Sequence, residues 1–231
     1  MLVESLPVRI AQNPDFCTNC YILSSAEEPD CALVIDPGDE AELILKQLGK
    51  RHLAAIVLTH GHYDHIGAVP ELVLATDAHI YAHQADAEAI AQSYDRIKSG
   101  FAAFLNRTHA KRGGGNDSGQ AILDKTAPRI DTLVKDGDHI RQCGLDLQVW
   151  HTPGHTKGSI CLLDATGGRL FSGDTLFKGT CGRTDFFGGS PENMHASLQR
   201  LKTLPASTKV FPGHDQTTTI GEEMDRGLNE Y

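Results

Sequence analysis

The stretch from Thr59 to Gly67, T-H-G-H-Y-D-H-I-G, constrains this chain more than any other feature. Three histidines and one aspartate fall within six residues of it: His60, His62, Asp64 and His65. An apolar run at residues 53–58 precedes the motif, and its length favours a buried strand. Imidazole and carboxylate groups bind divalent transition metals, so the motif predicts a metal site at the end of a strand.

The spacing within the motif indicates two ions. If the chain stays extended past the strand, His60 and His62 point to the same side, because strand side chains alternate. These two imidazoles can then chelate one ion. Asp64 and His65 follow a turn and are adjacent, so we expect them to reach a second ion. A single loop cannot complete two coordination spheres, and further ligands are therefore required from later in the chain.

Three later apolar runs supply those ligands. Each ends in a short loop rich in Gly or Thr with one His or Asp, namely His155, Asp174 and His214. The carboxyl ends of strands commonly gather at one rim of a sheet, so we expect all seven side chains to converge.

The predicted centre holds two divalent ions. We assign His60, His62 and His155 to the first ion. Asp64, His65 and His214 are assigned to the second ion, and Asp174 bridges the two. Zinc suits this ligand set, and iron or manganese are alternatives.

The expected nucleophile is a hydroxide, because water between two ions about 3.5 to 4 Å apart loses a proton near neutral pH. Asp64 and Asp174 are the expected catalytic carboxylates, since they hold the ions. Asp36, at the end of another apolar run, is expected to orient a ligand imidazole from behind. His151 is expected to lie behind the ligands.

Composition narrows the class of protein. With 231 residues and 40% hydrophobic residues, we expect one domain over residues 1–231. The net charge of -9 argues against binding to nucleic acid or to an anionic membrane surface. We find neither a signal-like start nor a run of about 20 apolar residues, and so expect a cytoplasmic protein without a membrane span. The oligomeric state stays open.

The six cysteines are scattered, which predicts reduced thiols. Cys17 and Cys20 form a lone C-x-x-C, which we interpret as structural.

The remaining pattern alternates strands and helices. Antiparallel strands are predicted at 21–23 and 31–35, a hairpin at 159–163 and 169–172, and a helix capped by Asp39. Residues 92–127 form a predicted insertion, with an amphipathic helix from about residue 90 and a glycine-rich loop at 113–119. Its excess of basic residues indicates either a solvated face or a rim that attracts an anionic substrate.

The motifs together resemble the metallo-β-lactamase-fold hydrolases. The segments are T-H-G-H-Y-D-H-I-G, T-P-G-H-T with His155, S-G-D-T-L-F with Asp174, and P-G-H with His214. Within that superfamily the chain is similar to glyoxalase II (hydroxyacylglutathione hydrolase), in a small form without the C-terminal helical domain. The resemblance implies an α/β fold, an αββα sandwich of two mixed sheets with helices on both outer faces.

The resemblance also implies a substrate. Residues 179–183, G-T-C-G-R, are similar to the stretch with which glyoxalase II holds glutathione, so Arg183 is expected to bind a substrate carboxylate. Residues 184–186 look more like the small relatives and the persulfide dioxygenases. The expected function is hydrolysis of a small acyl thioester of the hydroxyacylglutathione type by a dinuclear centre.

Three alternatives stay open. One is a persulfide dioxygenase with a single iron on His60, His155 and Asp174. Another is a lactonase or other ester hydrolase that uses the same hydroxide. The third is a binding module without catalysis.

Overall fold

The computed structural model describes residues 1–11, 13–93 and 130–226, and two mixed sheets form its centre. The first has the order β1-β2-β3-β4-β5-β6: Leu2–Ile10, Asn13–Ser24, Cys31–Ile35, His52–Val57, His79–His83 and Thr132–Val134. The second has the order β14-β13-β10-β9-β8-β7: Thr218–Thr219, Lys209–Pro212, Arg169–Gly173, Ile160–Asp164, Leu145–His151 and His139–Gln142. A small ribbon pairs β11 (Leu176–Phe177) with β12 (Thr180–Cys181).

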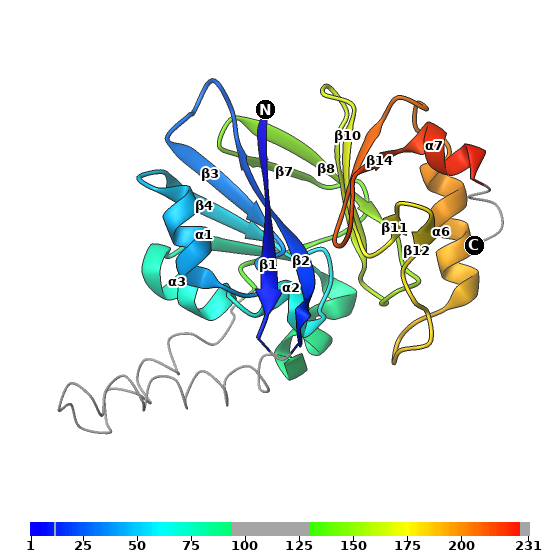
Figure 1. Ribbon diagram of the computed structural model, residues 1–231, viewed down its shortest axis with the longest axis horizontal. Coiled ribbons are helices and arrows are strands. Elements are labelled where there is room, and N and C mark those ends of the chain that lie inside the picture. The colour runs from blue at the N-terminus through cyan, green and yellow to red at the C-terminus, as the bar shows by residue number, and fades with distance from the viewer. Residues whose placement is uncertain (12, 94–129, 227–231) are drawn as a thin grey trace.

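Helices cover the outer faces of both sheets (Figure 1). Helices α1 (Ala41–Leu48) and α3 (Val69–Thr76) lie on the first sheet, and α6 (Pro191–Leu201) and α7 (Ile220–Asp225) lie beside the second. Two shorter helices, α2 (Tyr63–Ile66) and η1 (Gln84–Asp86), lie in the connections. This is the expected metallo-β-lactamase sandwich, and the predicted fold class is confirmed.

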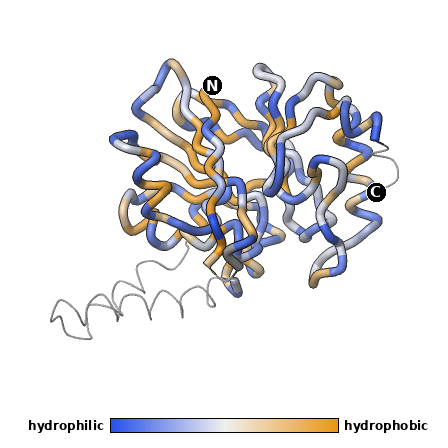
Figure 2. The backbone as a smooth tube through the Cα atoms, viewed as in Figure 1, coloured by the Kyte–Doolittle hydropathy of each residue, from blue (hydrophilic) through white to orange (hydrophobic). Residues whose placement is uncertain are grey.

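Strand β3 shows why its sequence is apolar throughout. Leu33 and Ile35 belong to the core between the sheets, with Phe171 and Phe211 of the second sheet. Ala32 and Val34 face the other way, into the core beneath α1 and α3. A strand buried on both faces has no position for a polar side chain, and in Figure 2 the strands are correspondingly the most hydrophobic segments.

Several predicted elements are present with small shifts. Strands β2 and β3 pair antiparallel, and so do β9 and β10. Helix α6 starts as expected, with the Ser190 hydroxyl accepting a hydrogen bond from the backbone N–H of Asn193. Only the first residues of the predicted insertion are described, since 94–129, including the glycine-rich stretch, lie outside the described residues.

The predicted cap of α1 is wrong. The residue before the helix is Glu40, in a left-handed conformation with φ of 55°. Asp39 instead accepts hydrogen bonds from the backbone N–H groups of Ala11 and Glu40. Its carboxylate therefore secures the loop after β1 rather than the first turn of the helix.

The prediction of reduced thiols is wrong for two of the cysteines. Cys31 at the start of β3 and Cys143 in the turn between β7 and β8 form a disulfide, with a sequence separation of 112. Cys17, Cys20, Cys161 and Cys181 are free. The pairing arises because the two sheets pack face to face, which brings together residues far apart in the sequence.

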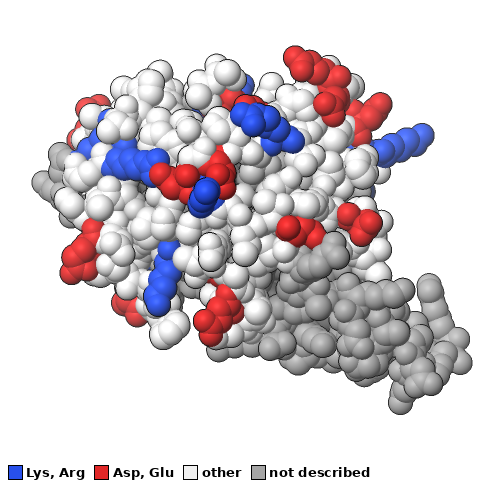
Figure 3. Space-filling view, turned by 180° about the vertical axis from the view of Figure 1, so that it is seen from behind, with Lys and Arg blue, Asp and Glu red and all other residues white. Residues whose placement is uncertain are grey.

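The charge on one face of the surface and the length of the helices both bear on possible partners. Acidic and basic side chains are interspersed on the face shown in Figure 3, rather than gathered by sign. Within the described ranges, every helix is too short or too polar to cross a membrane.

Candidate metal centre

The seven predicted side chains meet at one end of the sandwich, where β4, β8, β10 and β13 end. Six of them are buried, and His62 is half-buried. Six of them form two groups, and within each group the possible ligand atoms lie within 4.8 Å of one another: His60, His62 and His155, and Asp64, His65 and His214. His60 and His65 also form a third such group with Asp36. The structure thus brings together every residue of the predicted set, and the two predicted groups of three are among the three clusters found in the described residues.

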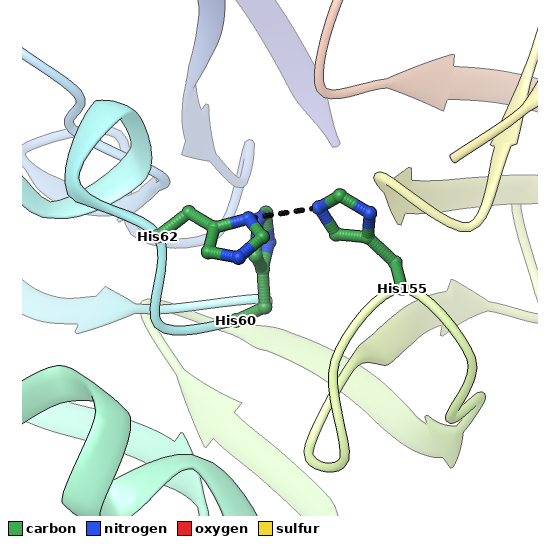
Figure 4. Close-up of side chains that lie close together, drawn as sticks. All are labelled: His60, His62 and His155. Atoms are coloured by element: carbon green, nitrogen blue, oxygen red, sulfur yellow. Dashed lines mark hydrogen bonds between the residues drawn. The ribbon is translucent and has the colours of Figure 1, made fainter. Parts of the chain in front are cut away.

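In the first group the imidazoles point toward one another (Figure 4). Nε2 of His155 lies 2.9 Å from Nδ1 of His62. The ring of His60 lies beside that of His62, with centroids 4.8 Å apart. Strand β4 ends at Val57, so the convergence of His60 and His62 comes from the loop and not from strand alternation.

The second group depends on α2, which begins immediately after His62. That turn presents Asp64 and His65 together, and His214 approaches from the loop after β13. Nε2 of His65 lies 3.2 Å from Nε2 of His214. Oδ2 of Asp64 lies 3.5 Å from Nε2 of His214.

Asp174 lies between the groups. Its Oδ2 lies 3.4 Å from Nε2 of His155, and its Oδ1 lies 3.3 Å from Nε2 of His65. This close packing requires Gly213, because a Cβ atom there would lie 2.3 Å from Oδ1 of Asp174. A single carboxylate therefore faces both groups, as a bridging ligand would.

The donor set fits divalent metal ions. Nε2 of His60 and Oδ1 of Asp174 are buried and make no hydrogen bond to the described part of the chain. Buried polar atoms normally have a partner, so atoms left without one at the meeting point of imidazoles and carboxylates are suited to an ion.

The outer ring nitrogens are held from behind. Nδ1–H of His155 donates to the carbonyl of Arg183 at 2.7 Å, and Nδ1–H of His214 donates to the carbonyl of Cys17 at 2.8 Å. Nδ1 of His65 lies 2.9 Å from Oδ2 of Asp36. These contacts turn Nε2 of each ring inward. The sequence indicated Asp36, but the two carbonyl groups have no residue signature and were missed.

The electrostatics differ between the groups. Burial, followed by the neighbouring imidazoles, lowers the pKa of His60 well below its usual value and lowers that of His62 to about 4. These two rings are therefore neutral, the form that binds metals. Burial would also lower the pKa of His65, but the carboxylates around it, Asp174 foremost, outweigh burial and raise it.

His214 behaves like His65. Burial opposes its charge, yet hydrogen bonds to Asp174 and Asp64 raise its pKa to about 9. Burial would raise the pKa of Asp174, but the surrounding imidazoles, His65 foremost and then His214, together hold it well below its usual value. Without an ion, the carboxylates of the second group thus favour the protonated forms of His65 and His214, and these rings must lose a proton to bind a metal.

Arg183 lies at the surface beside the first group. Its guanidinium binds the Asp185 carboxylate through two hydrogen bonds of 2.9 and 2.7 Å. It also lies over the ring of Phe186, which packs edge-on against His62. The predicted substrate-binding cation is thus at the rim of the centre, with its fork occupied by a neighbouring carboxylate.

His151 lies further from the centre. Its ring stacks on that of His83, and its Nε2 lies 2.9 Å from the carbonyl oxygen of Lys157. It therefore contacts the loop that carries His155. Asp86, behind the first group, contacts the same loop and is a residue that sequence reasoning missed.

Comparisons with known proteins identify the family of this chain. The family model described as "Metallo-beta-lactamase superfamily" matches residues 14–214. The chain belongs to the metallo-β-lactamase superfamily, whose members bind divalent metals and include metal-dependent hydrolases.

The curated relatives are similar to this chain over most of its length. An uncharacterized protein of Aquifex aeolicus is 35% identical, with 100% of this chain and 97% of that protein covered. The probable metallo-hydrolase YqgX of Bacillus subtilis is 33% identical, with 90% of each covered. A hydroxyacylglutathione hydrolase of Pseudomonas entomophila is 35% identical, but only 67% of that protein is covered.

Solved structures show the same fold. BLEG-1, a B3 metallo-β-lactamase, has a TM-score of 0.74 with 28% identity and all of both chains covered. TTHA1623, solved in a di-iron-bound form, has a TM-score of 0.68 with 33% identity, and 95% of this chain and 96% of that chain are covered. ETHE1 from Myxococcus xanthus has a TM-score of 0.69 with 28% identity, and 99% and 83% are covered.

Proposed function

We propose that this protein is a dinuclear metal-dependent hydrolase that cleaves a small acyl thioester of the hydroxyacylglutathione type. The observation that carries the proposal is the position of Asp174 between two complete groups of three ligands. A single-ion centre has no need of the second group. The di-iron-bound form of TTHA1623 also supports two ions.

Each residue has a definite part in this proposal. His60, His62 and His155 would hold one ion, Asp64, His65 and His214 the other, and Asp174 both. Zinc is the proposed metal, because neutral imidazole and carboxylate are its usual ligands, while iron or manganese would also fit. Such ions, when bound, supply Lewis acid chemistry, which lowers the pKa of water and polarises a carbonyl.

Two exposed aromatic rings lie at the rim of the centre. Phe16 lies against His214 with ring centroids 4.4 Å apart, and the ring centroid of Phe186 lies 5.6 Å from that of His62. These rings offer apolar surface to a thioester. Arg183, next to Phe186, is the proposed contact for a substrate carboxylate.

The named relatives support a thioester substrate. The hydroxyacylglutathione hydrolase of Pseudomonas entomophila is similar over 91% of this chain. The residues at 179–183 resemble the glutathione-holding stretch of that family. The proposed location is the cytoplasm, where a thioester of a cellular thiol would be found.

Elemental analysis of the purified protein, combined with an assay of S-lactoylglutathione cleavage, tests the proposal. We expect about two ions per chain. Chelation should abolish cleavage, and added Zn²⁺, Mn²⁺ or Fe²⁺ should restore it. Cleavage that persists after complete removal of metal would rule the mechanism out.

A second candidate is a persulfide dioxygenase, supported by the structural similarity to ETHE1 and by residues 184–186. This reaction would use one iron on His60, His155 and Asp174, a set of two histidines and one carboxylate. The dioxygenase would be favoured over the hydrolase by three results together: one iron per chain, oxygen uptake with glutathione persulfide, and absence of thioester cleavage.

A further inference from the structure

A buried carboxylate outside the seven ligands joins the two loops that form the first group. Asp86 ends η1 after β5 and is only 2% exposed. Its Oδ2 accepts hydrogen bonds from the backbone N–H of Gly61 at 2.9 Å and from the Thr156 hydroxyl at 2.7 Å. Its Oδ1 accepts from the backbone N–H of Gly158 at 2.6 Å.

The donors are placed next to the candidate ligands. Gly61 lies between His60 and His62, and Thr156 directly follows His155. The first loop continues β4 of one sheet, and the second continues β8 of the other. One carboxylate thus ties together the two loops whose separation determines whether the three imidazoles can share an ion.

The surrounding packing leaves this carboxylate little freedom. A Cβ atom on Gly158 would lie 2.6 Å from the backbone nitrogen of Asp86 and 2.7 Å from its Cγ. The η1 turn is itself fixed, because Nδ1 of His83 accepts a hydrogen bond from the backbone N–H of Ala85. Asp86 therefore cannot move without moving both loops.

We propose that Asp86 is a positioning residue that sets the spacing of His60 and His62 relative to His155, and thereby the affinity for the first ion. This inference rests on the proposed metal centre. Asp86 contacts none of the metal positions directly, and acts through Gly61, Thr156 and Gly158.

An asparagine at this position makes a sharp test. All three groups around the carboxylate donate, and two of them are backbone N–H groups that cannot accept. Either orientation of the amide places its NH₂ against one of those N–H groups, so at least one loop loses its hydrogen bond. Gly158→Ala disturbs the same contact from the other side and keeps the carboxylate.

The matched control is Asp164→Asn. Asp164 is 6% exposed and also accepts from a hydroxyl, a backbone N–H and a third donor: Thr166, Gly167 and Arg169. It lies in the hairpin between β9 and β10, whose turn is not part of the metal centre. The control therefore shows the effect of losing a buried carboxylate that does not connect the two loops of the first group.

The experiment is a titration of the metal-free proteins with Co²⁺, followed by its visible absorption. A His65→Ala background confines binding to the first group, and a His62→Ala background confines it to the second. In the first background, Asp86→Asn and Gly158→Ala should each weaken Co²⁺ binding about tenfold and change the absorption spectrum. In the second background, Asp86→Asn and Gly158→Ala should leave Co²⁺ affinity unchanged. Asp164→Asn should leave it unchanged in both backgrounds.

Each outcome decides the question. Unchanged Co²⁺ affinity in the first background, with a melting temperature lowered as in Asp164→Asn, shows a purely structural role and overturns the inference alone. Wild-type protein that binds no Co²⁺ or Zn²⁺ overturns the proposed function and this inference together. If Asp86→Asn does not fold, Gly158→Ala and Thr156→Val decide by the same criterion.

Discussion

Oδ2 of Asp36 lies 2.9 Å from Nδ1 of His65, although 29 residues separate them in sequence. Both side chains are buried. Because a carboxylate only accepts, Nδ1 of His65 carries a proton, and Nε2 faces Asp174 and His214. Asp36 also accepts from the backbone N–H and the hydroxyl of Thr59, at 2.8 and 2.6 Å. The carboxylate thus fixes both the ring and the start of the metal-binding loop.

Asp36→Asn should therefore lower the affinity for the second ion. Both carboxylate oxygens of Asp36 accept from donors, so the NH₂ of an asparagine faces a donor in either orientation of the amide. Either His65 or Thr59 then loses its hydrogen-bond partner. We expect metal affinity and kcat to fall about 10- to 100-fold. Elemental analysis measures the metal content, and an assay of thioester cleavage measures kcat. Asp146→Asn is the control, since Asp146 pairs with His139 on the surface. Full metal content in Asp36→Asn would show that the pair has no such role.

His65→Ala separates the two candidate enzymes. In a dinuclear hydrolase it should reduce bound metal from about two ions per chain toward one, and cost several kcal/mol of transition-state stabilisation, roughly 10²- to 10³-fold in kcat. In a dioxygenase with one iron it should leave that iron in place. Elemental analysis and kcat are the measurements, with the exposed His195→Ala as control. Unchanged metal content and unchanged cleavage would contradict the dinuclear proposal.

Arg183 and Asp185 form an exposed pair at the rim, and the two substitutions should act in opposite directions. Arg183→Ala should raise KM for S-lactoylglutathione by roughly two- to fivefold, the modest effect expected at a solvated site. Asp185→Asn frees the guanidinium and should lower KM. Metal content should not change in either variant. An equal loss on a thioester without a carboxylate would indicate that Arg183 acts on the loop and not on substrate.

Glu71 on α3 should make stability depend on pH. Burial, and less strongly Asp39, raise its pKa from 4.5 to about 6, and its Oε2 makes no hydrogen bond to the described residues. Between pH 4.5 and 6 the folded state retains a proton that the unfolded state loses, so the free energy of unfolding falls as pH rises. The loss is at most about 2 kcal/mol and persists above pH 6.

Glu71→Gln removes this penalty. Denaturant unfolding of the metal-free proteins should show the variant more stable than wild type at pH 7.5 and equal to it near pH 4. Other titrating groups cancel in the difference between the two proteins. If the two proteins differ in free energy of unfolding by the same amount at both pH values, the ionisation of Glu71 does not destabilise the folded state.

The local sequence determined the kinds of ligand and the places where they occur. His60, Asp174 and His214 each follow an apolar run that is long enough only for a strand, so both the chemistry and the strand end could be read from neighbouring residues. The burial of β3 on both faces also follows from its composition, because a strand enclosed on both faces admits only apolar side chains. These features depend on residue identity at short range, which a sequence states directly.

Tertiary structure decided how those pieces contact one another. Asp174 faces both groups, Asp86 ties two loops, and Cys31 meets Cys143 only because two sheets pack face to face. The carbonyl groups of Cys17 and Arg183 that hold His214 and His155 belong to the backbone, which every residue has. Such contacts depend on the path of the whole chain and not on the side chain at one position, and for that physical reason the sequence alone could not reveal them.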